Sequence, residues 1–450
     1  MSLKTIYVHE CFTAEHPALM GCLHADTLHR KETCSFEYHA DWLQHHANHC
    51  FLDPDLQLYQ GRQYAPIKKS LFGLFSDSCP DRWGRLLMRR METILANRES
   101  RKPRQLTETD YLLGVHDEAR MGALRFSLQP NGPFMSSDHD MAAAPPWSSL
   151  HELEAASLAF EQDEDLPLMS SLVFRRSDFY QCSSPDKLFA TQTGQLLNDR
   201  WLRQLLVSGS CLGGARPKVT VKDARDHLWI AKFPSHHDEQ DIGAWEQVAH
   251  ELAKACGLHT PESKLERFSD KGSTFLVKRF DRQNQHRIHF ASAMALLGQM
   301  DGAGSETGQS YLDIAEFITA YGSNPQEDLE ELWKRILFSI AISNTDDHLR
   351  NHGFQLTHQG WRLSPLYDVN PVPYGEMLAL NISLDDARMD PELAIDVAPY
   401  FGIKKQAARE TAQKLLGTIR RLWRPLSADC GLPHAAQEAM APAFDVAEHF

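Results

Sequence analysis

The stretch NTDDHLRNHGF, residues 344–354, is the most informative part of this sequence. It directly follows the apolar run Ile336–Ile342, it contains two adjacent acids, and it places Asn351 five residues after Asp346. A carboxylate can accept a proton from a substrate hydroxyl, and carboxylate and amide oxygens are the hard ligands that Mg²⁺ prefers. The loop therefore indicates chemistry at a hydroxyl group, assisted by a divalent cation.

Protein kinases use the same spacing in their catalytic loop, where the Asp accepts the hydroxyl proton and the Asn holds a second Mg²⁺. Seventeen residues after Asn351, the stretch WRLSPLYDVNP places Asp368 behind an apolar run, in the position of the kinase metal-binding Asp. One Asp-to-Asn match arises often by chance, so this loop alone does not establish a kinase. Asp347 stays open as the base in place of Asp346, and His348 as a residue that supports the loop.

Upstream, a lysine lies on the apolar face of a predicted strand. In Leu228–Phe233, alternation places Lys232 on the same side as Leu228 and Ile230, where a lysine is costly unless it meets a carboxylate or a phosphate. The alternative is an edge strand from which Lys232 reaches water. The segment Asp241–Cys256 has helical spacing and carries Glu246, which is either the partner of Lys232 or a solvated helix residue.

A glycine-rich loop, SGSCLGGARPK at 208–218, leads into this strand pair. Glycines at 209, 213 and 214 allow backbone amides to approach a phosphate closely, although a surface turn would have the same composition. The sequence lacks GxxxxGK[ST], which argues against a P-loop NTPase. The order of glycine loop, strand lysine, helix glutamate, catalytic-loop acids and distal acid is a much stronger signal than any one of them.

Length and composition favour a globular protein of two or three domains. The 450 residues include 46 Lys plus Arg and 60 Asp plus Glu, for a formal net charge of −14, and 42% are hydrophobic. This charge argues against a whole-surface nucleic-acid binder. The nine cysteines are scattered and never form CxxC, there is no signal-peptide pattern at the start, and no apolar run approaches the ~20 residues that span a bilayer. We therefore expect a cytoplasmic protein with no membrane partner.

The combination of motifs resembles the HipA family of bacterial toxin kinases. The matching stretches are GGARPK (213–218), IAKFP (230–234), KRFDR (278–282), NTDDHLRNHGF and SPLYDVNP, and in the N-terminal part PDRWGRLLM (80–88) and MGALRFS (121–127). The resemblance covers most of the chain and is weakest over 131–200 and beyond about 400. It implies an α+β, two-lobed protein-kinase-like fold with a mixed N-terminal subdomain packed on the smaller lobe and a mainly helical C-terminal lobe. The expected divisions are 1–150, 151–283 and 284–450.

The resemblance also implies roles for individual residues. Lys232 would contact the ATP phosphates with Glu246 holding it, and Gly213 and Gly214 would belong to the nucleotide loop. The KRFDR stretch would be the hinge, with Lys278 and Phe280 lining the adenine pocket. The remaining roles fall on Asp346 as the catalytic base, on Asn351 as a catalytic-loop residue, and on Asn351 and Asp368 as Mg²⁺ ligands.

In this family the glycine loop carries a serine that is autophosphorylated. Ser210 is the first candidate and Ser208 the second, while Cys211 would occupy the same position in a register shifted by one residue. A cysteine would not replace the phosphorylation chemistry of a serine. The resemblance further implies a protein substrate in translation, such as an aminoacyl-tRNA synthetase, and a HipB-like helix-turn-helix antitoxin through which the kinase reaches DNA indirectly.

Three other functions remain open at this level. A catalytically silent kinase-fold corepressor would act with a DNA-binding antitoxin, although all five expected polar positions are present. A small-molecule kinase would share the two lobes. A metal-dependent hydrolase would use Asp346, Asp347 and His348, but it would leave Lys232 and the glycine loop without a role.

Overall fold

We describe the fold from a computed structural model of the chain. The described residues are 2–13, 16–28, 31–46, 51–135, 144–164, 188–190, 196–198, 204–205, 207–209, 214–283 and 286–450. Ser210, Cys211 and Gly213 of the glycine loop lie outside these ranges. Among the described residues, no helix is both long and apolar enough to cross a lipid bilayer.

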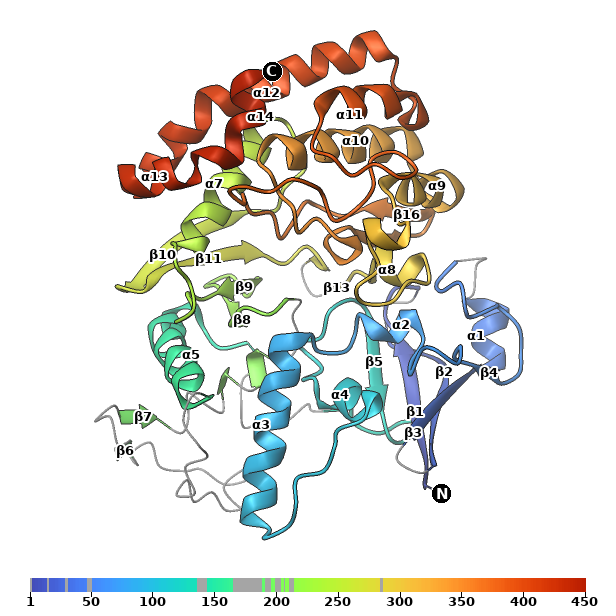
Figure 1. The fold of residues 1–450 in the computed structure, drawn as a ribbon. Helices are drawn as coiled ribbons and strands as arrows, with labels where there is room; N and C mark the ends of the chain where they lie inside the picture. Colours follow the sequence, from blue (N-terminus) through green and yellow to red (C-terminus); the bar gives the residue numbers. More distant parts are fainter. Residues whose placement is uncertain are drawn as a thin grey trace.

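The N-terminal part is built on an antiparallel sheet with the order β4-β3-β2-β1-β5 (Figure 1). Its strands are β1 (Ser2–Glu10), β2 (Ala18–Leu28), β3 (Lys31–Tyr38), β4 (Gln63–Tyr64) and β5 (Leu124–Ser127). Alternate apolar residues of these strands, among them Ile6, Leu23 and Phe36, are buried, as the period of two in a half-buried strand requires. Three short helices accompany the sheet, namely α1 (Ala40–His45), α2 (Gly73–Ser76) and α4 (Glu108–Gly114).

The longest helix of the N-terminal part, α3 (Arg82–Arg98), packs on a different sheet. Its N-cap residue Asp81 accepts a hydrogen bond from the backbone of Gly84, which satisfies one of the unpaired amides of the first turn. The helix then places Trp83 and Leu87 in the core of the small lobe. Residues 80–88, which resemble a family motif, therefore connect the N-terminal part to that lobe.

The small lobe is an antiparallel sheet with the order β10-β11-β9-β8. Its elements are β8 (Lys218–Lys222), β9 (Leu228–Lys232), β10 (Ser263–Ser269) and β11 (Gly272–Lys278), together with α5 (Leu150–Glu164) and α7 (Ile242–Ala255). One face carries Val219, Trp229 and Leu276 against α3 and α5. The opposite face carries Lys218 and Lys232. The predicted strand pair and the helix at 241–256 are confirmed, while β10 was not predicted. A separate hairpin is formed by β6 (Leu188–Ala190) and β7 (Leu196–Asn198).

The large lobe is mainly helical, as predicted (Figure 1). Its helices are α8 (Ala293–Leu296), α9 (Tyr311–Tyr321), α10 (Pro325–Ala341), α11 (Pro391–Val397), α12 (Lys405–Asp429), α13 (His434–Met440) and α14 (Asp445–His449). A three-stranded sheet joins β14 (Phe290–Ser292), β15 (Gly353–Thr357) and β16 (Gly360–Leu363), and β12 (Arg282–Gln283) pairs with β13 (His286–Arg287). The second half of α10 is buried, and this positions the loop that follows it.

The N-terminal part packs on the smaller lobe, as expected, and it also contacts the large lobe. The carboxylate of Asp77 accepts hydrogen bonds from the backbone and the hydroxyl of Ser292, at 2.7 and 2.9 Å. Nε1 of Trp361 donates to the backbone oxygen of Phe51 at 2.8 Å. Because one apolar core includes both N-terminal strands and large-lobe helices, this part bridges the two lobes. The boundary predicted near 150 falls at the first residue of α5 and stays a prediction.

Candidate active site

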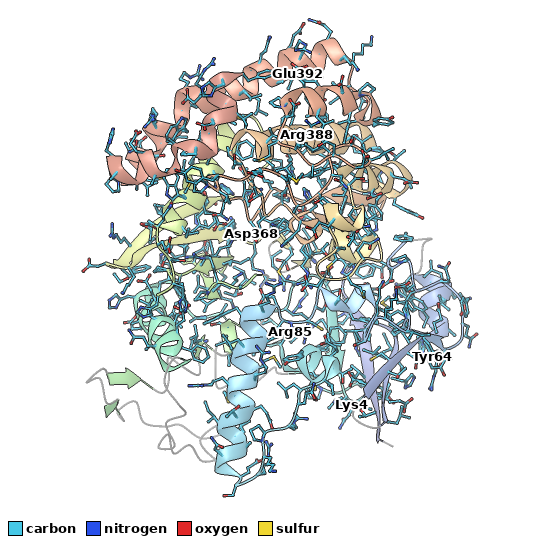
Figure 2. The ribbon with its side chains drawn as sticks, in the orientation of Figure 1. Lys4, Tyr64, Arg85, Asp368, Arg388 and Glu392 are labelled. Carbon is cyan, nitrogen blue, oxygen red and sulfur yellow. The ribbon has the colours of Figure 1, made fainter. Side chains whose placement is uncertain are left out.

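A buried lysine bridges two carboxylates at the centre of the molecule. Lys232 ends β9, and its Nζ lies 2.5 Å from Oε1 of Glu246 on α7. The same Nζ lies 2.5 Å from Oδ1 of Asp368, which is 136 residues further along the chain. Lys232 and Glu246 are buried, whereas 35% of the Asp368 side chain is exposed. Figure 2 labels Asp368 between the small-lobe sheet and the helical lobe, so the cluster joins the two lobes.

The charges in this cluster stabilise one another. Burial lowers the pKa of Lys232, but the two carboxylates outweigh burial and hold it above its ordinary value. Burial raises the pKa of Asp368, but Lys232 and Lys218 outweigh it and hold that pKa below its usual range. For Glu246, burial raises the pKa by more than Lys232 lowers it. A lysine that stays charged next to a partly exposed carboxylate suits the binding of phosphate oxygens and a cation.

A second buried lysine, Lys218, lies beside Lys232 and was not singled out from the sequence. The two residues are directly opposite each other in the β8–β9 ladder, so their side chains leave the sheet on the same face. Nζ of Lys218 lies 3.8 Å from Oδ2 of Asp81, the N-cap residue of α3. Burial lowers the pKa of Lys218, and burial raises the pKa of Asp81 to about 6 even though Lys218 opposes that rise. The N-terminal part thus contributes a carboxylate to this region.

Asp346 and Asn351 lie in one tight loop between α10 and β15. Nδ2 of Asn351 donates a hydrogen bond to the backbone oxygen of Asp346 at 2.8 Å, and Leu349–Asn351 form a single 3-10 turn. The Asp346 side chain is 84% exposed, which leaves its carboxylate accessible to an incoming hydroxyl. Asn351 is buried, and its bond uses the amide nitrogen, so its oxygen is the atom that can face a cation. The structure therefore brings together the two loop residues that the spacing predicted.

The adjacent acid, Asp347, turns into the core of the large lobe. Its Oδ2 accepts hydrogen bonds from the hydroxyls of Tyr311, at 2.7 Å, and Ser339, at 3.0 Å. Nε2 of His352 lies 3.1 Å from its Oδ1. Burial raises the pKa of Asp347, but His352 and the hydroxyl donors outweigh burial and lower it. Because Asp347 is buried and Asp346 is exposed, the geometry favours Asp346 as the base. Asp347 instead stabilises the loop through its bonds to the core.

Asp368 and Asn351 each keep an oxygen of the type that Mg²⁺ prefers. Lys232 contacts one carboxylate oxygen of Asp368, which leaves Oδ2, and Asn351 offers its amide oxygen. Mg²⁺ in proteins typically takes one or two such ligands and completes its shell with phosphate oxygens and water. Within the described ranges, no group of three or more His, Cys, Asp or Glu side chains is arranged to hold a metal. Of the three residues that the hydrolase alternative would use, Asp347 is buried and bound to Tyr311 and Ser339.

Of the two predicted adenine-pocket residues, the structure does not bring the Lys278 side chain to the Lys232 face. Lys278 pairs with Trp229 in the β11–β9 ladder, whereas Lys232 pairs with Phe275. Successive side chains leave a strand on opposite faces, so Lys278 and Lys232 point to different sides of the sheet. Nζ of Lys278 lies 3.6 Å from Oε2 of Glu262, away from the cluster.

Phe280 is connected to the site through aromatic contacts. Its ring centroid lies 5.7 Å from that of Tyr367, the residue before Asp368, and 5.9 Å from that of Phe290. The Tyr367 hydroxyl donates to the backbone oxygen of Arg350 at 2.5 Å, which connects the Asp368 segment to the loop that carries Asp346. Phe280 thus brings the 278–282 segment next to the Asp368 segment, and its contact with adenine stays a prediction.

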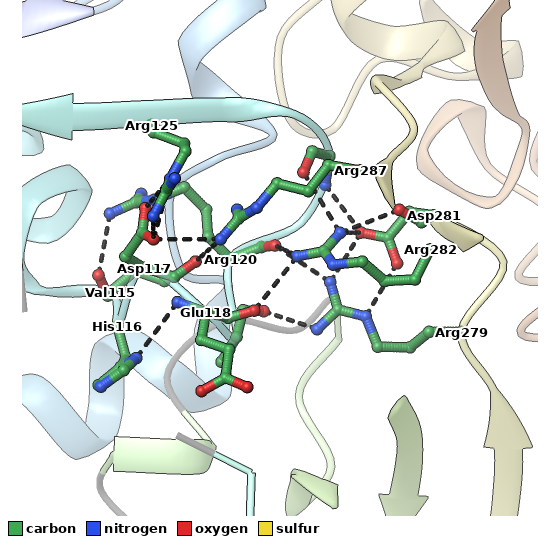
Figure 3. Close-up of polar contacts among 12 residues, drawn as sticks. Val115, His116, Asp117, Glu118, Arg120, Arg125, Arg279, Asp281, Arg282 and Arg287 are labelled. Carbon is green, nitrogen blue, oxygen red and sulfur yellow. Dashed lines mark hydrogen bonds and ion pairs between the residues drawn. The ribbon is translucent and has the colours of Figure 1, made fainter. Parts of the chain in front are cut away.

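A cluster of arginines fixes the 278–282 segment to the N-terminal part (Figure 3). Arg279 donates to the backbone oxygens of Ala119 and Arg120, and Asp281 accepts from the backbone of Gly122 at 2.8 Å. Asp281 is fully buried, and although burial raises its pKa, Arg279 and Arg282 hold it well below its usual range. Two of the stretches that suggested the family, 121–127 and 278–282, therefore interlock.

The predicted glycine loop is described only at its two ends. Ser208 is buried, and its hydroxyl donates to the backbone oxygen of Gln204 at 2.7 Å, so in this conformation it is not accessible to a nucleotide. Gly214 has φ +97°, and a Cβ there would lie 2.5 Å from Nζ of Lys218. A side chain at this position would therefore push Lys218 out of place.

Comparison with known proteins gives three matches of interest. Residues 210–423 match the family of HipA-like C-terminal domains. A Haemophilus influenzae protein named as a candidate kinase is 28% identical over 189 residues, which are 38% of this chain and 55% of that protein. The Shewanella oneidensis serine/threonine-protein kinase toxin HipA is 26% identical over 182 residues, 36% of this chain and 41% of the toxin. These alignments span about half the length of the curated relatives.

Among solved structures, the chain is similar to one from the Shewanella oneidensis toxin–antitoxin complex of HipA, HipB and operator DNA. The TM-score is 0.59 at 16% sequence identity, and the match covers 98% of this chain and 97% of the other. At this identity the likeness concerns the fold, and it extends over the N-terminal part as well as both lobes. The predicted α+β, two-lobed fold is confirmed.

Proposed function

The chain carries a HipA-like C-terminal domain within a HipA-type fold and is a HipA-family protein, and from this premise we propose that it is an ATP- and Mg²⁺-dependent serine/threonine protein kinase. The observation that carries the proposal is the position of the Lys232 ammonium, 2.5 Å from Glu246 and 2.5 Å from Asp368. Kinases require this lysine–glutamate ion pair and the metal-binding Asp in place at the same time. An exposed Asp346 on a neighbouring loop completes the arrangement.

In the proposed reaction, each side chain has one task. Lys232 binds phosphate oxygens of ATP, and Glu246 holds its ammonium in position. Asn351 and Asp368 would hold Mg²⁺, which would supply neutralisation of charge on the phosphates. The substrate hydroxyl oxygen bonds to the γ-phosphorus, the bond to the bridging oxygen breaks, ADP leaves, and the hydroxyl proton passes to the carboxylate of Asp346.

The biological setting is also a proposal. The relatives include a protein named as a serine/threonine-protein kinase toxin and one solved in complex with HipB and operator DNA. We propose that this chain is the toxin of such a pair, acts in the cytoplasm, binds a HipB-like helix-turn-helix antitoxin and reaches DNA through it. A net charge of −14 agrees with a protein whose antitoxin partner makes the contacts with DNA. An aminoacyl-tRNA synthetase is the type of substrate we propose.

The test is transfer of labelled phosphate from ATP in the presence of Mg²⁺, followed by mass spectrometry of the 201–218 segment. We expect phosphate on Ser210, or on Ser208 after the buried end of the loop opens, and none in the Asp346→Ala variant. Asp429→Ala, which removes an exposed carboxylate at the end of α12, is the matched control and should behave as wild type. Nucleotide binding without transfer to this segment or to any protein of a cell lysate would support the silent corepressor instead.

A further inference from the structure

The segment that follows Asp368 exposes three large apolar side chains. Residues 370–390 contain Tyr374, Met377 and Leu384, which are 79%, 55% and 80% exposed. Between them, Leu378, Leu380 and Ile382 are buried and anchor the segment to the large lobe. Three exposed apolar side chains within eleven residues exceed the scattered single ones that a soluble surface normally carries.

This segment runs directly alongside the loop of Asp346. The backbone of Val372 donates to the oxygen of Ser343 at 3.3 Å, and the backbone of Asn370 donates to Oδ1 of Asn344 at 3.4 Å. Gly375 packs so closely on Thr345 that a Cβ there would collide with the Thr345 methyl group. Tyr374 therefore lies next to the loop that holds the proposed catalytic base.

The backbone of Tyr374 is strained although the side chain is exposed. Its φ is +62°, a conformation that a bulky residue rarely adopts. The described residues include five non-glycine positions with positive φ, and three of them, Ser343, Asp368 and Tyr374, belong to the site or to this segment. Backbone strain of this kind clusters at active sites and at the segments that clamp ligands.

The charge of the segment is acidic. Residues 370–390 contain Glu376, Asp385, Asp386 and Asp390 and a single basic residue, Arg388. Arg388 is already paired with Asp386, at 2.6 Å. With the exposed carboxylate of Asp346 nearby, this surface presents negative charge around its apolar side chains.

We infer that Tyr374, Met377 and Leu384 form a docking surface for an extended, basic segment of a protein substrate. The acceptor serine or threonine of that segment lies at Asp346, an apolar neighbour packs on Tyr374 and Met377, and flanking arginines or lysines meet Glu376, Asp385 and Asp390. The inference rests on the proposed kinase activity and adds a substrate class to it. Two observations favour a basic peptide at this surface. The surface is acidic, and the segment contacts the loop that carries Asp346.

The test uses two synthetic peptides that share one serine and one adjacent leucine and differ only in their flanking residues, arginines in one and glutamates in the other. Binding is measured by fluorescence anisotropy on the Asp346→Ala protein with ATP and Mg²⁺, so that binding is read without turnover. Phosphorylation is measured on the protein with Asp346 intact. We expect the arginine peptide to bind and react at least about tenfold better than the glutamate peptide, because several complementary charges at one surface together contribute a difference of this size.

Tyr374→Ala should weaken binding of the arginine peptide about tenfold and raise its KM, because truncation of an aromatic anchor commonly costs this much. Tyr64→Ala removes a tyrosine that is 63% exposed on β4 and should change neither value. Equal binding of the two peptides, or a Tyr374→Ala protein with unchanged affinity, would overturn the inference. A wild-type dimer that Tyr374→Ala converts to a monomer would also overturn it, since the surface would then join two copies. Absence of any phosphorylation with intact peptide preference would instead overturn the kinase proposal alone.

Discussion

Removing the Asp347 carboxylate should destabilise the large lobe, whereas removing Asp346 next to it should not. The Asp347 carboxylate is buried and accepts bonds from Tyr311 and Ser339 at 2.7 and 3.0 Å, with His352 at 3.1 Å. In Asp347→Ala these three buried partners lose their common acceptor. The carboxylate of Asp346 makes no buried contact, because its side chain is 84% exposed.

The size of the effect follows from the partners. A hydrogen bond to a charged group contributes about 1.5–3 kcal/mol, and breaking a buried charged pair costs about 3–5 kcal/mol in total. We therefore expect Asp347→Ala to lower the free energy of unfolding of the large lobe by about 4 kcal/mol. With a urea dependence of about 2 kcal/mol per molar, the midpoint of that transition falls by about 2 M.

The assay is urea unfolding followed by tryptophan fluorescence, with Asp346→Ala as the matched control. The control should keep the wild-type free energy of unfolding within about 0.5 kcal/mol, the range usual for surface substitutions. If Asp347→Ala unfolded at the wild-type midpoint, the assignment of a structural role to Asp347 would be refuted. If Asp346→Ala lost as much stability as Asp347→Ala, the division of tasks between the two acids would be wrong.

Three further predictions concern other parts of the structure. Glu246→Gln should raise the Kd for ATP, measured by titration calorimetry, about five- to tenfold. Lys232 then keeps only one charged partner, and the weaker positioning of its ammonium costs about 1–1.4 kcal/mol of binding free energy. Glu251→Gln on the same helix is the control and should leave that Kd unchanged. Asp281→Ala should lower the free energy of unfolding by about 3–5 kcal/mol, because Arg279 and Arg282 lose the carboxylate that they share. An unchanged melting temperature would contradict this. His289 is buried, and burial lowers its pKa to about 3. Between about pH 6.5 and pH 3 the folded protein therefore binds fewer protons than the unfolded chain does. The free energy of unfolding should fall by about 1.4 kcal/mol for each unit by which the pH drops in this range. His289→Phe should flatten that slope in acid unfolding experiments.

The local elements of the site were predictable because their patterns are local. Alternation in β9 and helical spacing in α7 placed Lys232 and Glu246, and the two residues form the ion pair that these patterns suggested. Lys218 lies opposite Lys232 in the β8–β9 ladder and on the same face of the sheet. This pairing depends on the register between two strands, which the sequence does not give. Lys278 shows the limit of assigning residues by motif, because the register of β11 turns its side chain to the opposite face of the sheet.

What could not be predicted depends on contacts between distant parts of the chain. The approach of Asp81 to Lys218 joins the start of α3 to β8, and no spacing in the sequence encodes it. The edge strand β10 (Ser263–Ser269) was missed because it is half-exposed along its length and so has no run of buried residues. The five-residue spacing to Asn351 favoured Asp346 over Asp347 in the sequence, but the structural role of Asp347 follows only from the direction in which its side chain leaves the loop.

The most direct test of the kinase site measures ATP affinity and phosphoryl transfer on the same preparations of wild-type and Asp346→Ala protein. Our account predicts that the variant binds ATP and Mg²⁺ as the wild type does, because the residues that hold the nucleotide are untouched, and that it transfers no phosphate to its own chain or to a lysate protein. Transfer at the wild-type rate by a folded Asp346→Ala protein would contradict the account.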